Sequence, residues 1–197
     1  MSVTQKVVFL PGLAGERALI AGLVAGEEAA FRACYEQHAP RVLRILTRLL
    51  RSQAWAEEIL QESFIAAFRA VGEFRGEARL GSWLVGIAMR RGFNALRGED
   101  RRERHRPEPD DHHNAEPWLV ERDLSRRVLK LLDQMDPEKK ATLLLYGEGH
   151  TAAEIAEILN EPRGTILSRL SRARAELAER AAAAGLTASA VLAEEGS

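Results

Sequence analysis

The stretch Thr151–Ala175, TAAEIAEILNEPRGTILSRLSRARA, contains two helical patterns joined by a tight connection at residues 160–164. Thr151 and Glu154 form a capping-box pattern at the start of the first helix. The residues expected where the helices cross are the small Ala153 and Ala156, and those expected in the core are Ile155, Ile158, Leu159, Ile166 and Leu170. This pattern is typical of a helix-turn-helix, which places the start of its second helix in the major groove of DNA.

The second of these helices carries arginines and hydroxyls on the sides that packing leaves free. They are Arg163, Thr165, Ser168, Arg169, Arg172 and Arg174. Arginine can pair bidentately with guanine, and other polar groups can hold phosphates. The alternative is an ordinary helical hairpin with solvated arginines. A net charge of +3 between residues 163 and 180, from five basic and two acidic residues, favours DNA binding.

Helical patterns also fill the rest of the chain, so the predicted fold class is all-α: two small helical domains joined by a flexible linker. The boundaries expected are an extension at 1–17, a first domain at 18–97, an acidic linker at 98–118, a second domain at 119–184 and a tail at 185–197. The chain has 197 residues, 46% of them hydrophobic and 29% charged, which is typical of a soluble protein. Its longest uncharged stretch, Ala181–Ala193, has 13 residues, too few to cross a membrane.

In the first domain, helices are expected at 16–25, 27–37, 53–71 and 82–96, with a glycine-containing loop at 72–81. Pro40 is expected to kink or interrupt the continuation of the second helix to Arg51. The residues expected to face inward in that continuation are Val42, Ile45, Leu46, Leu49 and Leu50. In the last helix, the inward candidates are Trp83, Ile87 and Phe93.

Three blocks of the chain together resemble the extracytoplasmic-function class of bacterial RNA polymerase sigma factors. They are ALIAGLVAGEEAAFRACYEQHAPRVLRILTRLL (Ala18–Leu50), AEEILQESFIAAFRAVGEFRGEARLGSWLVGIA (Ala56–Ala88) and LDQMDPEKKATLLLYGEGHTAAEIAEILNEPRGTILSRLSRARAEL (Leu132–Leu177). The resemblance implies a cytoplasmic protein that binds core RNA polymerase, through the clamp helices of the largest subunit and the flap, and directs transcription from specific promoters of a stress- or signal-responsive regulon. It also implies an anti-sigma factor as a partner, and no catalysis of its own.

The resemblance assigns three groups of contact residues. Glu57, Glu58, Gln61 and Glu62 would dock on the clamp helices, although acidic residues at a helix start are also favoured by the helix dipole alone. Phe74, Arg75, Arg79, Arg90, Arg91 and Asn94 would melt the minus-ten promoter element and capture an unstacked base. Arg163, Thr165, Ser168, Arg169, Arg172 and Arg174 would bind the minus-thirty-five element.

Some positions depart from the family pattern: Trp55, Gly86, Arg90, Asn160, Glu161 and Leu167. Leu167 stands where the family usually has a basic residue, and it cannot make a bidentate base contact. Two other classes of protein stay open. One is a free-standing helix-turn-helix regulator. The other is a degenerate sigma factor that binds polymerase without promoter selectivity, which the departures at Leu167, Glu161 and Arg90 keep open. Asn160 tolerates a left-handed backbone, so the turn is expected to survive without a glycine.

The remaining candidates for chemistry are weak. Cys34 and His38 are best interpreted as a core cysteine and a surface histidine, because two ligands are too few for a structural zinc site. His105, His112 and His113 are expected to be solvated residues of the linker. We find no glycine-rich phosphate loop and no nucleophile elbow. The sequence predicts no enzyme, no metal site, no cofactor, no small-molecule substrate and no insertion into a membrane.

Overall fold

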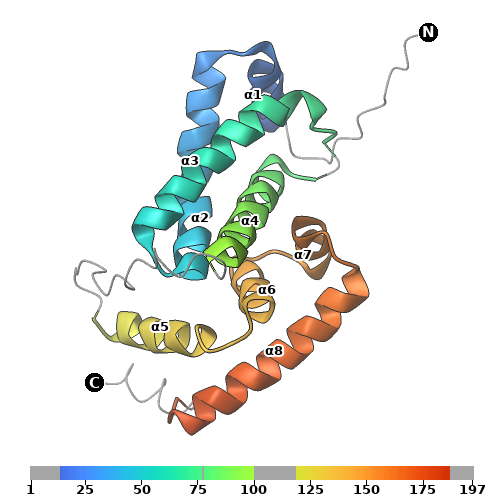
Figure 1. Cartoon of the computed structure of the whole chain (residues 1–197). Helices are drawn as coiled ribbons and strands as arrows, with labels where there is room; N and C mark the ends of the chain where they lie inside the picture. The colour runs from blue at the N-terminus through green and yellow to red at the C-terminus, as the bar shows by residue number, and fades with distance from the viewer. Residues whose placement is uncertain (1–13, 77, 100–118, 187–197) are drawn as a thin grey trace. The chain divides into compact units, whose positions relative to one another are not determined.

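The computed structural model describes residues 14–76, 78–99 and 119–186, and in these ranges its regular structure is entirely helical, with no strand (Figure 1). The predicted all-α fold is confirmed. The described residues fall into two compact units, one made of the residues up to 99 together with Glu157–Leu159, and one made of the other residues from 119 onward. Nearly all of the predicted linker, including its three histidines, and most of the predicted terminal extension and tail lie outside the described residues.

The first unit consists of α1 (Ala14–Ala25), α2 (Glu28–Leu50), α3 (Gln53–Ala70), a 3-10 turn η1 (Val71–Glu73) and α4 (Leu80–Glu99). Helices α2, α3 and α4 pack on one another, and α1 packs against α2 (Figure 1). All five residues of α2 that periodicity placed inward are buried: Val42, Ile45, Leu46, Leu49 and Leu50. Burying such side chains stabilises the fold by about 1.5–3 kcal/mol each.

Two expectations for this unit are corrected by the structure. Of the kink or interruption expected at Pro40, the interruption does not occur: helix α2 continues through Pro40, with Ala39 and Val42 buried on either side, so core packing outweighs the missing backbone N–H. The inner face of α4 is also shifted from its predicted position. Its buried residues include Leu80, Leu84, Val85, Ala88 and Met89, whereas Trp83, Ile87 and Phe93 are only half-buried.

The second unit consists of α5 (Leu119–Leu132), α6 (Pro137–Gly147), α7 (Ala152–Leu159) and α8 (Arg163–Ala183), with α5 and α6 both packed against α8. Asp136 caps α6, because its carboxylate accepts hydrogen bonds from the backbone N–H groups of Glu138 at 2.9 Å and Lys139 at 3.3 Å. With Pro137 as the first helical residue, these contacts set where α6 begins.

The capping box of α7 is confirmed as well. The Thr151 backbone N–H donates to the Glu154 carboxylate at 2.8 Å, and the Glu154 backbone N–H donates to the Thr151 hydroxyl at 3.2 Å. Asn160 turns the chain with a left-handed φ of 53°, so the connection to α8 works without glycine, as expected. Ala153 is exposed, however, and therefore does not sit at a close helix crossing. In the ranges that the structure describes, no helix is long and apolar enough to span a bilayer.

Candidate nucleic-acid interface

Helix α8 has one buried side and one exposed side. Ile166, Leu170 and Ala173 are buried, and they are spaced three or four residues apart along one face. The exposed residues of its first three turns include the polar Arg163, Ser168, Arg172 and Arg174. Leu167 stands among them with 49% of its surface exposed. Because its apolar side faces the core, α8 presents a basic surface to solvent, with Leu167 exposed within it.

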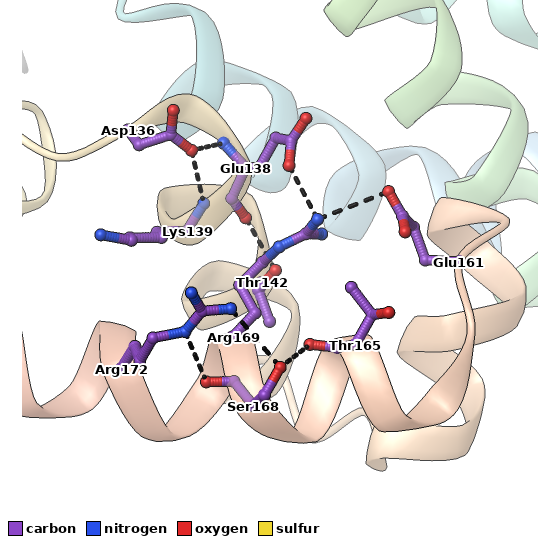
Figure 2. A network of polar contacts seen from close by, with 9 residues as sticks. All are labelled: Asp136, Glu138, Lys139, Thr142, Glu161, Thr165, Ser168, Arg169 and Arg172. Atoms are coloured by element: carbon purple, nitrogen blue, oxygen red, sulfur yellow. Dashed lines mark hydrogen bonds and ion pairs between the residues drawn. The ribbon is translucent and has the colours of Figure 1, made fainter.

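Arg169 does not belong to that exposed surface. Only 12% of its side chain is exposed, and one guanidinium nitrogen lies 2.7 Å from a Glu138 carboxylate oxygen and 3.4 Å from a Glu161 carboxylate oxygen (Figure 2). Glu138 is in the first turn of α6, and Glu161 is in the turn before α8. Arg169 therefore holds α8 to both of these elements, and its charge is largely compensated.

Arg172 lies back along its own helix. Its Nε donates to the Ser168 carbonyl oxygen at 3.3 Å and a terminal nitrogen reaches the Ser168 hydroxyl at 3.5 Å (Figure 2). The Ser168 hydroxyl in turn donates to the Thr165 carbonyl oxygen at 2.9 Å. These contacts are exposed, so Arg172 can leave them at small cost for a base edge or a phosphate. Arg172 and Ser168 together form a movable polar pair.

The two outer arginines of the predicted set have different surroundings. The Arg174 guanidinium lies 4.1 Å from the centroid of the Tyr146 ring, a cation–π contact that orients it beside α6. Arg163, at the first position of α8, has no ion-pair partner among the residues that the structure describes. Its charge is therefore available to a phosphate near the helix start.

The predicted polymerase-docking residues lie together on α3. Glu57, Glu58, Gln61 and Glu62 are all exposed. The α3 helix starts at a cap where the Ser52 hydroxyl accepts from the Trp55 backbone N–H at 3.3 Å. The Glu57 carboxylate accepts a hydrogen bond from Gln53 at 2.9 Å, and the Glu62 carboxylate forms an ion pair with Arg91 of α4 at 3.2 Å. The first half of α3 thus offers an acidic surface.

The predicted promoter-melting residues are divided between the loop before α4 and α4 itself. The Phe74 ring packs on the Trp83 ring with centroids 5.1 Å apart, which ties the start of the loop to the helix. Arg75 and Arg79 are exposed on the loop. On α4, Arg90 and Asn94 are exposed one turn apart, whereas Arg91 is half-buried beside Glu62.

A depression of about 620 Å³ lies where α1, α2 and the start of α4 meet, and sequence reasoning missed it. His38 lines it and is not the surface residue that was expected, because its Nε2 is buried and has no hydrogen-bond partner in the part of the chain that the structure describes. Burial lowers the pKa of His38 and the Arg41 charge lowers it further, while the Glu16 carboxylate opposes both. Glu16 was missed too, because the group that it contacts is 64 residues away in sequence.

Cys34 is a core residue, as expected. It is fully buried, and this burial raises the pKa of its thiol to about 11. The thiol is therefore a packing group and not a nucleophile at neutral pH. In the described ranges, no group of three or more His, Cys, Asp or Glu side chains is placed to hold a metal ion.

Comparison with known proteins agrees with the two units. Residues 34–102 match the family model "Sigma-70 region 2", and residues 125–177 match "Sigma-70, region 4". The chain is 30% identical over 176 residues to the ECF RNA polymerase sigma-E factor of Haemophilus influenzae. The aligned region covers 81% of this chain and 91% of that protein. It is 31% identical over 161 residues to the RNA polymerase sigma factor CarQ of Myxococcus xanthus, covering 78% and 90% of the two chains.

Solved structures show the same fold. The sigma factor RpoE from Bartonella quintana, solved with the anti-sigma factor NepR, superposes with a TM-score of 0.64 at 23% identity, covering 76% of this chain and 94% of that chain. CnrH, solved with the cytosolic domain of CnrY, superposes with a TM-score of 0.66 at 21% identity, covering 85% and 97%. Together with the sequence relatives, these likenesses confirm the predicted family. The chain belongs to the extracytoplasmic-function class of RNA polymerase sigma factors, and its function is to direct transcription initiation.

Proposed function

We propose that the two helical units divide the work of initiation. The first, at residues 18–97, binds core polymerase and opens the minus-ten element, and the second, at residues 119–184, reads the minus-thirty-five element. The observation that carries this proposal is the separation of exposed charge: carboxylates gather on α3, whereas arginines and hydroxyls gather on the outer side of α8. The matches to regions 2 and 4 support the same division.

The acidic surface of α3 is proposed to dock on a basic surface of polymerase, the clamp helices of its largest subunit. Four exposed polar residues make this surface: Glu57, Glu58, Gln61 and Glu62. Charged groups of this kind mainly raise the rate of association and fix the orientation of the complex. The second unit is proposed to contact the flap.

The loop between α3 and α4 is proposed to receive an unstacked base of the minus-ten element. The paired rings of Phe74 and Trp83 offer an apolar wall, and Arg75 and Arg79 on the same loop can hold the phosphates of the single strand. Arg90, Arg91 and Asn94 lie farther along α4, starting about 15 Å from its first residue, and are proposed to extend the contacts to the DNA on either side of the captured base. Melting would then be driven by tighter binding to the opened strand than to the duplex.

The minus-thirty-five contacts are proposed to come from Arg163, Thr165, Ser168, Arg172 and Arg174. Arg169 is proposed to act through its ion pairs instead, by fixing α8 for the other side chains. Leu167, exposed in the middle of this surface, can contact a thymine methyl group. The element read by this chain would therefore differ from that of relatives with a basic residue at this position.

The partners and the location follow from the same assignment. Since its relatives act on RNA polymerase, the chain is proposed to work in the cytoplasm as a non-enzymatic factor that binds core polymerase and promoter DNA and needs no cofactor. An anti-sigma factor is proposed as a regulator, because a structure of similar fold was solved with one.

Run-off transcription with purified core polymerase tests the proposal, on DNA from upstream of the gene for this chain. We expect a transcript that starts at one position and needs both the chain and core polymerase. A free-standing regulator would instead footprint the DNA without polymerase and give no transcript. A degenerate sigma factor would co-purify with core polymerase and give no promoter-specific transcript.

A further inference from the structure

Among the residues that the structure describes, no side chain of the preceding loop or of α4 itself caps the first turn of α4. Arg79 stands at the cap position, since its carbonyl oxygen accepts the backbone N–H of Trp83 at 3.0 Å, but an arginine side chain has no acceptor for the free N–H groups of a helix start. Helix starts normally use Ser, Thr, Asp or Asn for this purpose. The free N–H groups here are therefore left to water or to side chains of other elements.

One such side chain comes from α1. The Glu16 carboxylate accepts a hydrogen bond from the Leu80 backbone N–H at 2.5 Å, across a separation of 64 residues in sequence. A carboxylate at this position satisfies one free donor and also interacts favourably with the positive end of the helix dipole. Glu16 precedes the segment that matches region 2, which begins at residue 34. The cap of α4 is thus supplied from outside that segment.

Helix α2 also packs closely against the first turn of α4. A Cβ atom at Gly81 would lie only 3.2 Å from Nδ1 and 3.3 Å from Cε1 of His38, so the first turn of α4 is pressed against that ring. Glu16, His38 and Gly81 line the same depression. The start of α4 is therefore held by α1 on one side and by α2 on another.

The same contact fixes the end of the loop that precedes α4. Its beginning is held by the Phe74–Trp83 ring pair and its end by the Glu16–Leu80 hydrogen bond, with Arg75 and Arg79 exposed between them. We infer that Glu16 is a positioning residue for promoter melting, which sets the geometry of the base-capturing loop without touching DNA. This inference rests on the proposed role of the loop.

Transcription from a DNA pool randomised across both promoter elements tests the inference, using the full chain with core polymerase and sequencing of the transcripts. Glu16→Ala should lower selection at the minus-ten element roughly tenfold, because the cap hydrogen bond and its charge are lost, while selection at the minus-thirty-five element and binding to core polymerase stay unchanged. Glu16→Gln keeps an acceptor oxygen and should restore most of the selection. Glu28→Gln, which changes an exposed carboxylate at the start of α2, is the matched control and should behave as wild type.

Wild-type selection at the minus-ten element by Glu16→Ala would overturn the inference, as would an equal loss at both elements, which would indicate general destabilisation. A wild-type chain that binds core polymerase but selects no minus-ten element would overturn the proposed role of the loop instead. Hydrogen exchange of the Leu80 amide in the intact chain separates these cases. Exchange should rise roughly tenfold in Glu16→Ala if the cap exists, and unchanged exchange would overturn the contact itself.

Discussion

The Glu62 carboxylate lies 3.2 Å from a guanidinium nitrogen of Arg91, so the proposed polymerase-docking surface of α3 and the proposed promoter-melting helix α4 are joined by an ion pair. About half of the Glu62 side chain and more than a third of the Arg91 side chain are exposed. A pair this open contributes about 0–1 kcal/mol to stability. Each side chain can therefore leave the ion pair to bind another molecule. Polymerase binding at Glu62 would then free Arg91 for DNA.

Reversal of the charges at Glu58 and Glu62 tests the docking surface. We expect the Glu58→Lys, Glu62→Lys double variant to associate with core polymerase roughly tenfold more slowly, because the charge complementarity with a basic partner is lost. Its melting temperature should stay close to that of the wild type, since both side chains are exposed. Glu28→Lys, at an exposed ion pair on α2, is the control. Association at the wild-type rate would remove both residues from the docking surface.

Arg172 and Arg163 on the basic surface of α8 are expected to contribute differently to DNA binding. Arg172→Ala should cost about 1–3 kcal/mol on the correct minus-thirty-five DNA and little on a scrambled sequence, as expected for a base contact. Arg163→Ala should weaken binding to both DNAs alike and lower the salt slope by about one, as expected for a phosphate contact. Fluorescence anisotropy of the full chain across a salt series measures both. If both variants bind both DNAs like the wild type, the degenerate-sigma hypothesis gains.

Arg169 is expected to contribute to the stability of the fold and only indirectly to DNA binding. Arg169→Ala leaves the carboxylates of Glu138 and Glu161 without their shared partner, and should lower the free energy of unfolding by about 1–3 kcal/mol. Arg32→Ala, which breaks an exposed pair with Glu28, should change it by less than about 0.5 kcal/mol. Urea denaturation measures both values. Equal losses of unfolding free energy in the two variants would mean that the Arg169 ion pairs stabilise the fold no more than an exposed pair does.

His38 predicts a dependence of stability on pH. Its pKa is lower in the folded chain than the ordinary 6.5, so between the two values the unfolded chain binds more protons. The contribution of neutral His38 is complete above pH 6.5 and is lost as the pH falls toward the folded pKa. Urea denaturation between neutral and acidic pH should show this loss in the wild type and a smaller one in His38→Gln. The charged groups known to act on His38, Glu16 and Arg41, stay in place in that variant. Parallel pH curves would contradict the prediction.

Cys34 predicts very slow alkylation of the native chain. The thiol is fully buried with a pKa of about 11, so both access and thiolate formation oppose the reaction at neutral pH. Iodoacetamide should label it only as fast as the chain opens, and urea should accelerate labelling to the rate of a free thiol. Rapid labelling without denaturant would show that α2 opens locally at this position.

Local patterns predicted much of this structure. The buried face of α2 follows from its helical spacing, and the caps at Asp136 and at Thr151 with Glu154 follow from residue type, because each depends on side chains within one or two turns. The features that were missed depend on distant residues. Arg169 reaches Glu138 across 31 positions, and Glu16 reaches Leu80 across 64. Nothing in the spacing of such residues shows that they meet.

The inner face of α4 was missed for a different reason. Trp83 and Phe93 were among the residues expected to face inward, but they lie at the edge of the core, and the smaller Val85, Ala88 and Met89 fill its centre. Three helices meet there, and Gly92 lies so close to Leu49 that an added Cβ atom would come within 3.1 Å of that side chain. Close approach of helices selects small residues, and residue size alone does not reveal it.

The contact between Glu16 and Leu80 has a consequence for the order of events during synthesis. Glu16 leaves the ribosome first, yet its partner is made 64 residues later, so the first unit cannot complete the start of α4 until that whole length has emerged. Helices α2 and α3 can pair before then, because their contacts are nearer in sequence. The loop proposed to meet the promoter would thus become ordered only after α2 and α3 can pair, and a nascent chain would acquire its polymerase-docking surface before its ability to open DNA.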